Sequence, residues 1–244
     1  AVFSACILSY TWLLLIDFQW VRMIGFNQGT TELKMVYYLL LDCLPIFISA
    51  FLTNYIVNIP KNSIELFLSN DLQATYNVLF MPSAIITLFL SFVLVPMYTQ
   101  ISASWLQRDL RKFKSIISKI LVAIFVLTAL FSLAGYFIGI PILSIVYHID
   151  LSRFKEQFII LIIGGGINSL STFLVYILTV FKSQRVLIYV YFLTAIFATF
   201  ISNSWVKEYG ITGAALIYLV SILMIGVLLS CLSFYSYVKL KGRK

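Results

Sequence analysis

The chain has 244 residues, of which 61% are hydrophobic and only 11% are charged, and its mean hydropathy is +1.01. An average globular chain is about one quarter charged, so this composition excludes a soluble domain and predicts an all-α, polytopic transmembrane helix bundle. The net charge of +8 does not indicate nucleic-acid binding, because the basic residues lie between apolar runs and there set the topology.

Seven apolar segments are predicted to cross the membrane. The first, 1–16, begins inside an apolar run and is interpreted as the end of a longer helix; a polar stretch, 17–34, follows it. We expect residues 64–68 to make only a short interfacial turn, and Pro141 to close the fourth span. The six later spans are predicted at 35–57, 76–98, 116–140, 158–181, 186–201 and 211–238.

The distribution of Lys and Arg predicts the orientation. If the segments alternate in direction, 13 of the 17 basic residues lie on one side of the membrane and four on the other. Basic residues are in excess on the cytoplasmic side of membrane proteins. The C-terminus, with its basic tail 239–244, is therefore predicted to lie in the cytoplasm.

Asp42 is the only acid that we place well inside a span. A carboxylate facing lipid costs several kcal/mol, so this side chain is expected to face protein or water. One interpretation is a cation or proton site, or a gate in a polar cavity. The other is a polar pair that holds two helices together, and both stay open.

Two lysines near span ends are further candidates. Lys61 follows Pro60 at the outer mouth of the second span, where its charge could meet a phosphate or a sugar; a loop or snorkelling lysine is the alternative. Lys119 lies just inside the fourth span and is best explained by snorkelling toward the cytoplasm. The basic residues at 108–114, beside Trp105, are expected to set topology and to contact anionic lipid headgroups.

Glycines and prolines inside the spans predict close packing and kinks. Gly164, Gly165 and Gly166 allow helices to approach closely, or allow one helix to bend, and Gly135 with Gly139 is predicted to form a contact face. Three prolines, Pro45, Pro82 and Pro96, imply kinks in their helices. The backbone groups that a kink leaves without hydrogen bonds must find other partners, and kinked helices are common in carriers that alternate access.

No residue pattern indicates enzymatic chemistry. His148 is the only histidine, and the three cysteines have no metal-ligand spacing. A serine nucleophile elbow and a phosphate-binding glycine loop are both absent from the sequence. We therefore expect no enzyme activity, no cofactor and no metal.

Several short motifs resemble one family when taken in order. They are Leu44-Pro45, Asn58-x-Pro60-Lys61, the sequence DLQATY at 71–76, IPILSIVY at 140–147 and GITGAA at 210–215. Together they resemble the later half of Wzx-type oligosaccharide flippases, polysaccharide exporters of the multidrug/oligosaccharidyl-lipid/polysaccharide exporter superfamily. The chain departs from the family at His148, where glycine is usual.

The resemblance implies a domain organisation of two six-helix lobes, like that of MATE transporters. Residues 1–16 would end the last helix of a first lobe, 17–34 would form a cytoplasmic inter-lobe linker, and 35–238 would form the second lobe, followed by the tail 239–244. The first lobe, or a partner copy in its place, would then be needed for activity.

The resemblance also implies a function. Such proteins flip undecaprenyl-pyrophosphate-linked oligosaccharides across the bacterial cytoplasmic membrane by alternating access, for capsule, O-antigen or exopolysaccharide biosynthesis. Membrane lipids, the lipid-linked substrate and the polymerase and glycosyltransferases of the same pathway are the implied partners. The candidate cavity residues are Asp42, Asn58, Lys61, Lys119 and Asn168.

Two other classes of function remain. A MATE-like multidrug or cation antiporter would share the fold and would be favoured by an ion-binding carboxylate in the first lobe, which this sequence does not show. A membrane-embedded glycan polymerase or acyltransferase would need catalytic side chains, and a polymerase would usually carry them on a sizeable outer loop. The short connections between the predicted spans argue against the polymerase.

Overall fold

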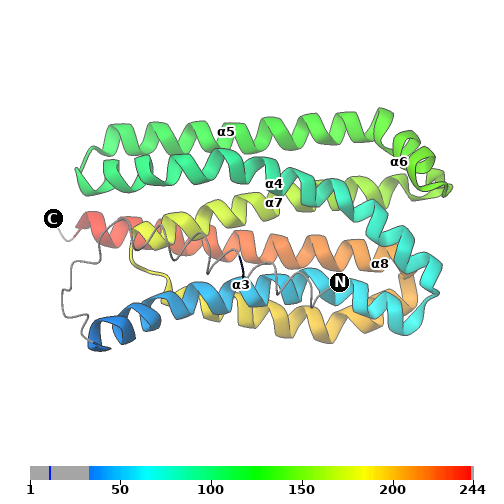
Figure 1. Ribbon diagram of the computed structural model, residues 1–244, viewed down its shortest axis with the longest axis horizontal. Coiled ribbons are helices and arrows are strands. Elements are labelled where there is room, and N and C mark those ends of the chain that lie inside the picture. Colours follow the sequence, from blue (N-terminus) through cyan, green and yellow to red (C-terminus); the bar gives the residue numbers. More distant parts are fainter. Residues whose placement is uncertain (1–10, 12–32, 243–244) are drawn as a thin grey trace. The chain divides into compact units, whose positions relative to one another are not determined.

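The computed structural model describes residue 11 and residues 33–242 (Figure 1). Apart from residue 11, the predicted segment 1–16 lies outside the described residues, and so does almost all of the linker 17–34. The predictions about both therefore stay predictions. The chain divides into two compact units, Ala1–Leu44 and Pro45–Lys244.

The described residues contain helices and no strand, which confirms the predicted all-α class. The elements are α3 (Leu33–Phe67), α4 (Asn70–Leu106), α5 (Leu110–Ala134), the π-helix η2 (Gly135–Gly139), α6 (Ile140–Tyr147), the 3₁₀-helix η3 (Ser152–Phe154), α7 (Lys155–Val180) and α8 (Arg185–Gly242). Five stretches are long and apolar enough to cross a membrane: Leu40–Phe67, Asn70–Leu106, Leu110–Tyr147, Ser152–Val180 and Arg185–Lys239. The protein is therefore a polytopic helical membrane protein.

Helix α8 consists of two antiparallel arms. Gly210 has φ 59° and ψ −134°, values outside the helical region, and the chain reverses its direction there (Figure 1). Val186 at the start of α8 and Leu232 near its end line the same surface hollow. Each arm exceeds the roughly 20 residues that a span needs, in agreement with the predicted spans 186–201 and 211–238. The predicted total of seven spans includes 1–16 and remains a prediction.

Two connections that the sequence predicted are helical in the structure. The polar stretch after residue 57 does not end α3, which continues through Pro60 to Phe67. Ile56, Ile59 and Ile64 are buried there, so packing of one helix face outweighs the polar composition of the other. Only Leu68 and Ser69 interrupt the helix, and the Ser69 hydroxyl caps α4.

The expectation that Pro141 closes the fourth span is wrong. Helix α5 continues through the π-turn Gly135–Gly139 into α6, where Pro141 occupies the first turn. The π-turn directly before Pro141 changes the local hydrogen-bond register, so the continuous helix accommodates a residue that has no N–H to donate. The helix ends instead at His148, which takes the left-handed conformation with φ 55°.

The connections sort charges to the two ends of the second unit. Turn 107–109, turn 181–184 and the end of α8 lie at one end, which we call the basic end (Figure 1). Residues 68–69, 148–151 and Gly210 lie at the other, near the acidic residues Glu65, Asp71, Asp150, Glu156 and Glu208. This arrangement agrees with the alternation counted from the sequence, whereas the cytoplasmic location of the basic end remains a prediction.

The glycines of α7 lie at the centre of the packing. A Cβ atom added to Gly164 would meet the Tyr218 ring of α8, one on Gly165 would meet Ser83 of α4, and one on Gly166 would meet Thr128 of α5. Successive helical residues point about 100° apart, so three consecutive glycines admit three neighbouring helices. The predicted packing role is confirmed.

A second glycine pair acts in the same way. Cβ atoms on Gly135 and Gly139 would each lie 2.8 Å from the Phe158 ring of α7. The two glycines therefore form the predicted contact face, and the buried Phe158 ring occupies it.

Candidate functional site: a polar face on helix α3

Helix α3 carries a row of exposed amides inside a stretch that is apolar enough to span the membrane. Asn54, Asn58 and Asn62 recur every fourth residue, and all three are exposed. Residues at this spacing lie on one side of a helix. We call these three residues the asparagine face. Because amides are unfavourable in hydrocarbon, the face is expected to contact water or protein instead of lipid.

The amides are held along the helix by local hydrogen bonds. The Asn54 side chain donates to the Ala50 carbonyl at 3.1 Å, and the Asn58 side chain donates to the Asn54 carbonyl at 2.8 Å. An asparagine amide has two N–H donors and one carbonyl acceptor. Each group therefore has a further donor and an acceptor to offer a solute.

Lys61 adds one positive charge beside the asparagine face. It lies three residues after Asn58, and its Nζ is 4.5 Å from the centre of the Phe80 ring of α4. Phe80 in turn packs edge-on against Tyr218 of α8, with ring centres 5.1 Å apart. The Tyr218 hydroxyl shares a buried hydrogen bond of 3.2 Å with Ser83. The lysine is thus supported by an aromatic platform built from two other helices.

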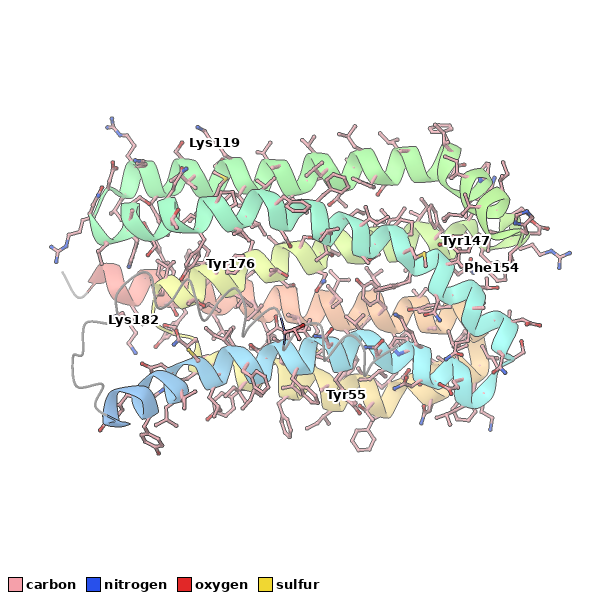
Figure 2. The ribbon with its side chains drawn as sticks, viewed as in Figure 1. Tyr55, Lys119, Tyr147, Phe154, Tyr176 and Lys182 are labelled. Atoms are coloured by element: carbon pink, nitrogen blue, oxygen red, sulfur yellow. The ribbon has the colours of Figure 1, made fainter. Side chains whose placement is uncertain are left out.

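Hydrogen bonds attach α3 to the first arm of α8. Ser63 Oγ lies 2.8 Å from Ser202 Oγ, and it donates to Asn203 Oδ1 at 2.9 Å. Tyr55, labelled in Figure 2, has its hydroxyl 3.3 Å from Thr199 Oγ1. These bonds fix the rotation of α3, so that the asparagine face stays exposed.

The structure brings two of the predicted site residues together. Asn58 and Lys61 share the exposed side of α3, as described above. Asn168 lies on α7 and is partly buried, in a helical row with Thr172, Tyr176 and Thr179. Tyr176 (Figure 2) packs against Tyr98 of α4 at 5.5 Å between ring centres. Asn168 thus belongs to a second polar row within the same unit.

The other two predicted residues lie elsewhere. Lys119 is exposed on α5 and points away from the neighbouring helices (Figure 2), so it is not grouped with Asn58 and Lys61. Asp42 is also exposed, but it belongs to the first compact unit. The predicted role of Asp42 remains a prediction.

The sequence analysis missed Asn54 and Asn62. Their four-residue spacing around Asn58 was a readable signal, but the predicted span ended at residue 57 and left Asn58 and Asn62 in a connection. Among the described residues there is no group of three or more His, Cys, Asp or Glu side chains that could hold a metal ion.

The long apolar helices and this polar face define the class: a polytopic helical membrane protein with a polar surface inside one span. No protein-family model, no curated protein and no solved structure matches the chain. A more particular function therefore depends on the chemistry of the face and on the motifs.

Proposed function

We propose that the chain is one lobe of a flippase that moves undecaprenyl-pyrophosphate-linked oligosaccharides across the bacterial cytoplasmic membrane. In this proposal the lobe alternates access with a second lobe, and its C-terminus lies in the cytoplasm. The observation that carries the proposal is the asparagine face with Lys61 on a membrane-spanning helix. The motif order described above supports the same family.

The chemistry of the face suits a glycan with a phosphate group. Amides both donate and accept hydrogen bonds, as sugar hydroxyls do, and their neutrality favours binding without trapping an ion. Lys61 supplies a point charge for a phosphate oxygen. A water-filled cavity between two lobes would also remove the cost of exposing three amides to lipid.

The antiporter alternative has less support. Between Pro45 and Gly242 the acidic residues all lie in connections or within a few residues of a helix end or of Gly210; they are Glu65, Asp71, Asp109, Asp150, Glu156 and Glu208. A carboxylate within the membrane is a common ion site in coupled carriers. Within the described residues Asp42 is the one acid that would serve.

The enzyme alternatives have less support still. From Pro45 onward, no non-helical connection in the described part of the chain is longer than four residues, and 148–151 is one of the two that reach this length. It carries His148 and Asp150, with Arg153 close by, all exposed at one end of the unit. A polymerase or acyltransferase would need catalytic groups converging on a pocket.

The test replaces two residues of the asparagine face in the full-length protein, which is expressed in place of the wild type in its own cell. Asn54→Leu with Asn58→Leu keeps the size of the side chains and removes their hydrogen bonding. We expect surface glycan to fall by about tenfold or more, the change that loss of about 1.4 kcal/mol of binding produces, while lipid-linked oligosaccharide accumulates inside the cell. Immunoblotting of the membrane fraction must show unchanged protein.

The matched control is Asn77→Leu, which replaces an exposed asparagine on α4 outside the asparagine face. This variant should export glycan normally. Wild-type export by the double variant would overturn the proposal. The proposal also requires a first lobe, encoded in frame before Ala1 or supplied by a second copy, and sequencing upstream of Ala1 distinguishes these sources.

A further inference from the structure

An apolar groove runs along the contact between α5 and α7, away from the asparagine face of α3. Its volume is about 460 Å³, and its lining is almost entirely hydrocarbon: Leu121, Ile124, Phe125, Thr128, Ala129, Ser132, Ile163, Gly166, Ile167 and Leu170. Phe125 is 75% exposed, so the groove opens at the surface. Gly166 forms part of the floor, where its missing side chain lets Thr128 of α5 pack directly against α7.

A second groove of about 280 Å³ continues the first toward the basic end. Leu121 lines both grooves. The second is walled by Phe113, Ile117, Phe173, Phe181, Phe234 and Tyr237, and it includes Lys114. Trp105 packs against Phe113 and Phe181, with ring centres 5.1 and 4.7 Å apart. This aromatic cluster supports the wall of the groove beside the basic end.

Where the second groove reaches the basic end of the unit, it carries positive charge and hydroxyl groups that have no hydrogen-bond partner in the described part of the chain. Lys114 lines it, and Arg111 lies one turn earlier on the same helix, exposed. Ser233 is 8% exposed, yet its hydroxyl has no hydrogen-bond partner among the described residues, and the same holds for the buried Tyr237 hydroxyl. An orphaned buried hydroxyl is unfavourable, so these two groups indicate a missing polar partner.

The part of the joined grooves between Lys114 and Ile124 matches one leaflet of a bilayer in length, and the wider groove continues along α5 as far as Ser132. Hydrocarbon of one leaflet is about 15 Å thick, half of the core. Helix α5 covers about this distance between Lys114 and Ile124, at 1.5 Å per residue. A chain that starts at the basic end would therefore pass from the narrower groove into the wider one.

We propose that the joined grooves bind one anionic membrane phospholipid. One acyl chain lies along Ile117, Leu121 and Ile124, and a phosphate oxygen accepts a hydrogen bond from Lys114. The ester oxygens accept from Tyr237 and Ser233 after their hydroxyls, which are buried in this structure, turn into the groove. Lys114 and Arg111 place two positive charges at the end of the groove, and these charges favour an anionic headgroup. The nearby Asp109 carboxylate accepts a hydrogen bond from the backbone N–H of Lys112 and caps the helix. This site requires only that the protein spans a membrane, so it is independent of the proposed transport function.

Native mass spectrometry of the purified full-length protein tests the site. After delipidation in mild detergent, the protein is titrated with phosphatidylglycerol or phosphatidylcholine of the same acyl chains. We expect one phosphatidylglycerol to be retained at concentrations where phosphatidylcholine is not. Lys114→Gln should lower the affinity for phosphatidylglycerol about fivefold, the effect expected of one cation beside an anionic headgroup, whereas Lys119→Gln, an exposed lysine outside the groove, should not.

A groove-filling variant tests the acyl chain separately. Leu121→Trp, at the residue that lines both grooves, should abolish retention of the bound lipid, whereas Val122→Trp, on an exposed position of α5 outside the grooves, should retain it. Equal retention in both variants would overturn the proposal, as would equal affinity for the two lipids. Retention of a polyprenyl phosphate in place of the phospholipid would overturn the proposed occupant.

Discussion

The ammonium nitrogen of Lys61 lies 4.5 Å from the centre of the Phe80 ring, although the two residues belong to different helices. A cation over a ring face gains about 0.5–1 kcal/mol when exposed and about 2 kcal/mol or more when desolvated. Lys61 is partly buried, so an intermediate value is expected. The contact holds the charge beside the asparagine face, where the proposed substrate phosphate would bind.

A double-mutant cycle with Lys61→Met and Phe80→Leu measures this contact. We expect the two changes to be coupled by about 1 kcal/mol in the free energy of unfolding, within the range for partly exposed pairs. Chemical denaturation in mixed detergent micelles provides the measurement. The pair Lys61→Met and Phe89→Leu is the control, because Phe89 contacts Phe131 instead; additive effects in both cycles would contradict the cation–π assignment.

Gly165 and Gly226 are expected to respond oppositely to alanine. A Cβ atom on Gly165 would lie 2.8 Å from the Ser83 carbonyl oxygen, a backbone atom that cannot move aside, whereas one on Gly226 would lie 3.4 Å from an Ile167 methyl group. Gly165→Ala should therefore cost about 1–3 kcal/mol through overpacking. Gly226→Ala should be neutral or stabilise by up to about 1 kcal/mol, since alanine is the better helix former. Equal melting temperatures for the two variants would refute the close packing of α4 on α7.

Gly210 is the position where α8 reverses. Its φ of 59° and ψ of −134° resemble the first central residue of a type II′ turn, and a Cβ there would have no atom within 4 Å. Gly210→Ala is thus expected to cost about 1–3 kcal/mol through backbone strain alone. Ser204→Ala, an exposed helical position nearby, should leave the midpoint of unfolding unchanged. If the two substitutions have the same effect, the turn does not require glycine.

Asp150 lies in the connection between α6 and η3, outside the membrane-spanning stretches. The Ser152 hydroxyl donates to its carboxylate at 2.6 Å and the Ser152 backbone N–H at 3.0 Å; these bonds, with the charge of Arg153, lower the pKa of Asp150. A lowered carboxyl pKa contributes stability above the unfolded-state pKa of about 3.9, and this contribution is lost as the pH falls through the folded-state value. Ser152→Ala should raise the pKa of Asp150, as measured by carbon-detected NMR titration. Ser144→Ala should not, because its hydroxyl accepts from Leu151 instead.

The positions of the long helices along the chain could be predicted, because each helix depends on the composition of its own segment. The runs around 76–98 and 158–181 are long and predominantly apolar, with few polar side chains and no charge well inside them, so they are helical and suited to the membrane whatever packs against them. The boundaries could not be predicted, because α3 beyond residue 57 and α6 beyond Pro141 are stabilised by residues far away in the chain. The candidate site was affected by the same error: Asn58 and Lys61 were identified, but Asn54 and Asn62 were not grouped with them.

The sequence by itself determined that this protein is helical, lies in a membrane and carries its charges between apolar runs. Hydrophobicity acts on each segment separately, so these properties need no tertiary information. Only the tertiary structure decided which side of each helix is covered. Hydrogen bonds from Ser63 to α8 hold one side of α3 inward and leave the asparagine row exposed, and Phe80 of α4 lies beside Lys61, because contacts between distant segments depend on shape and not on composition.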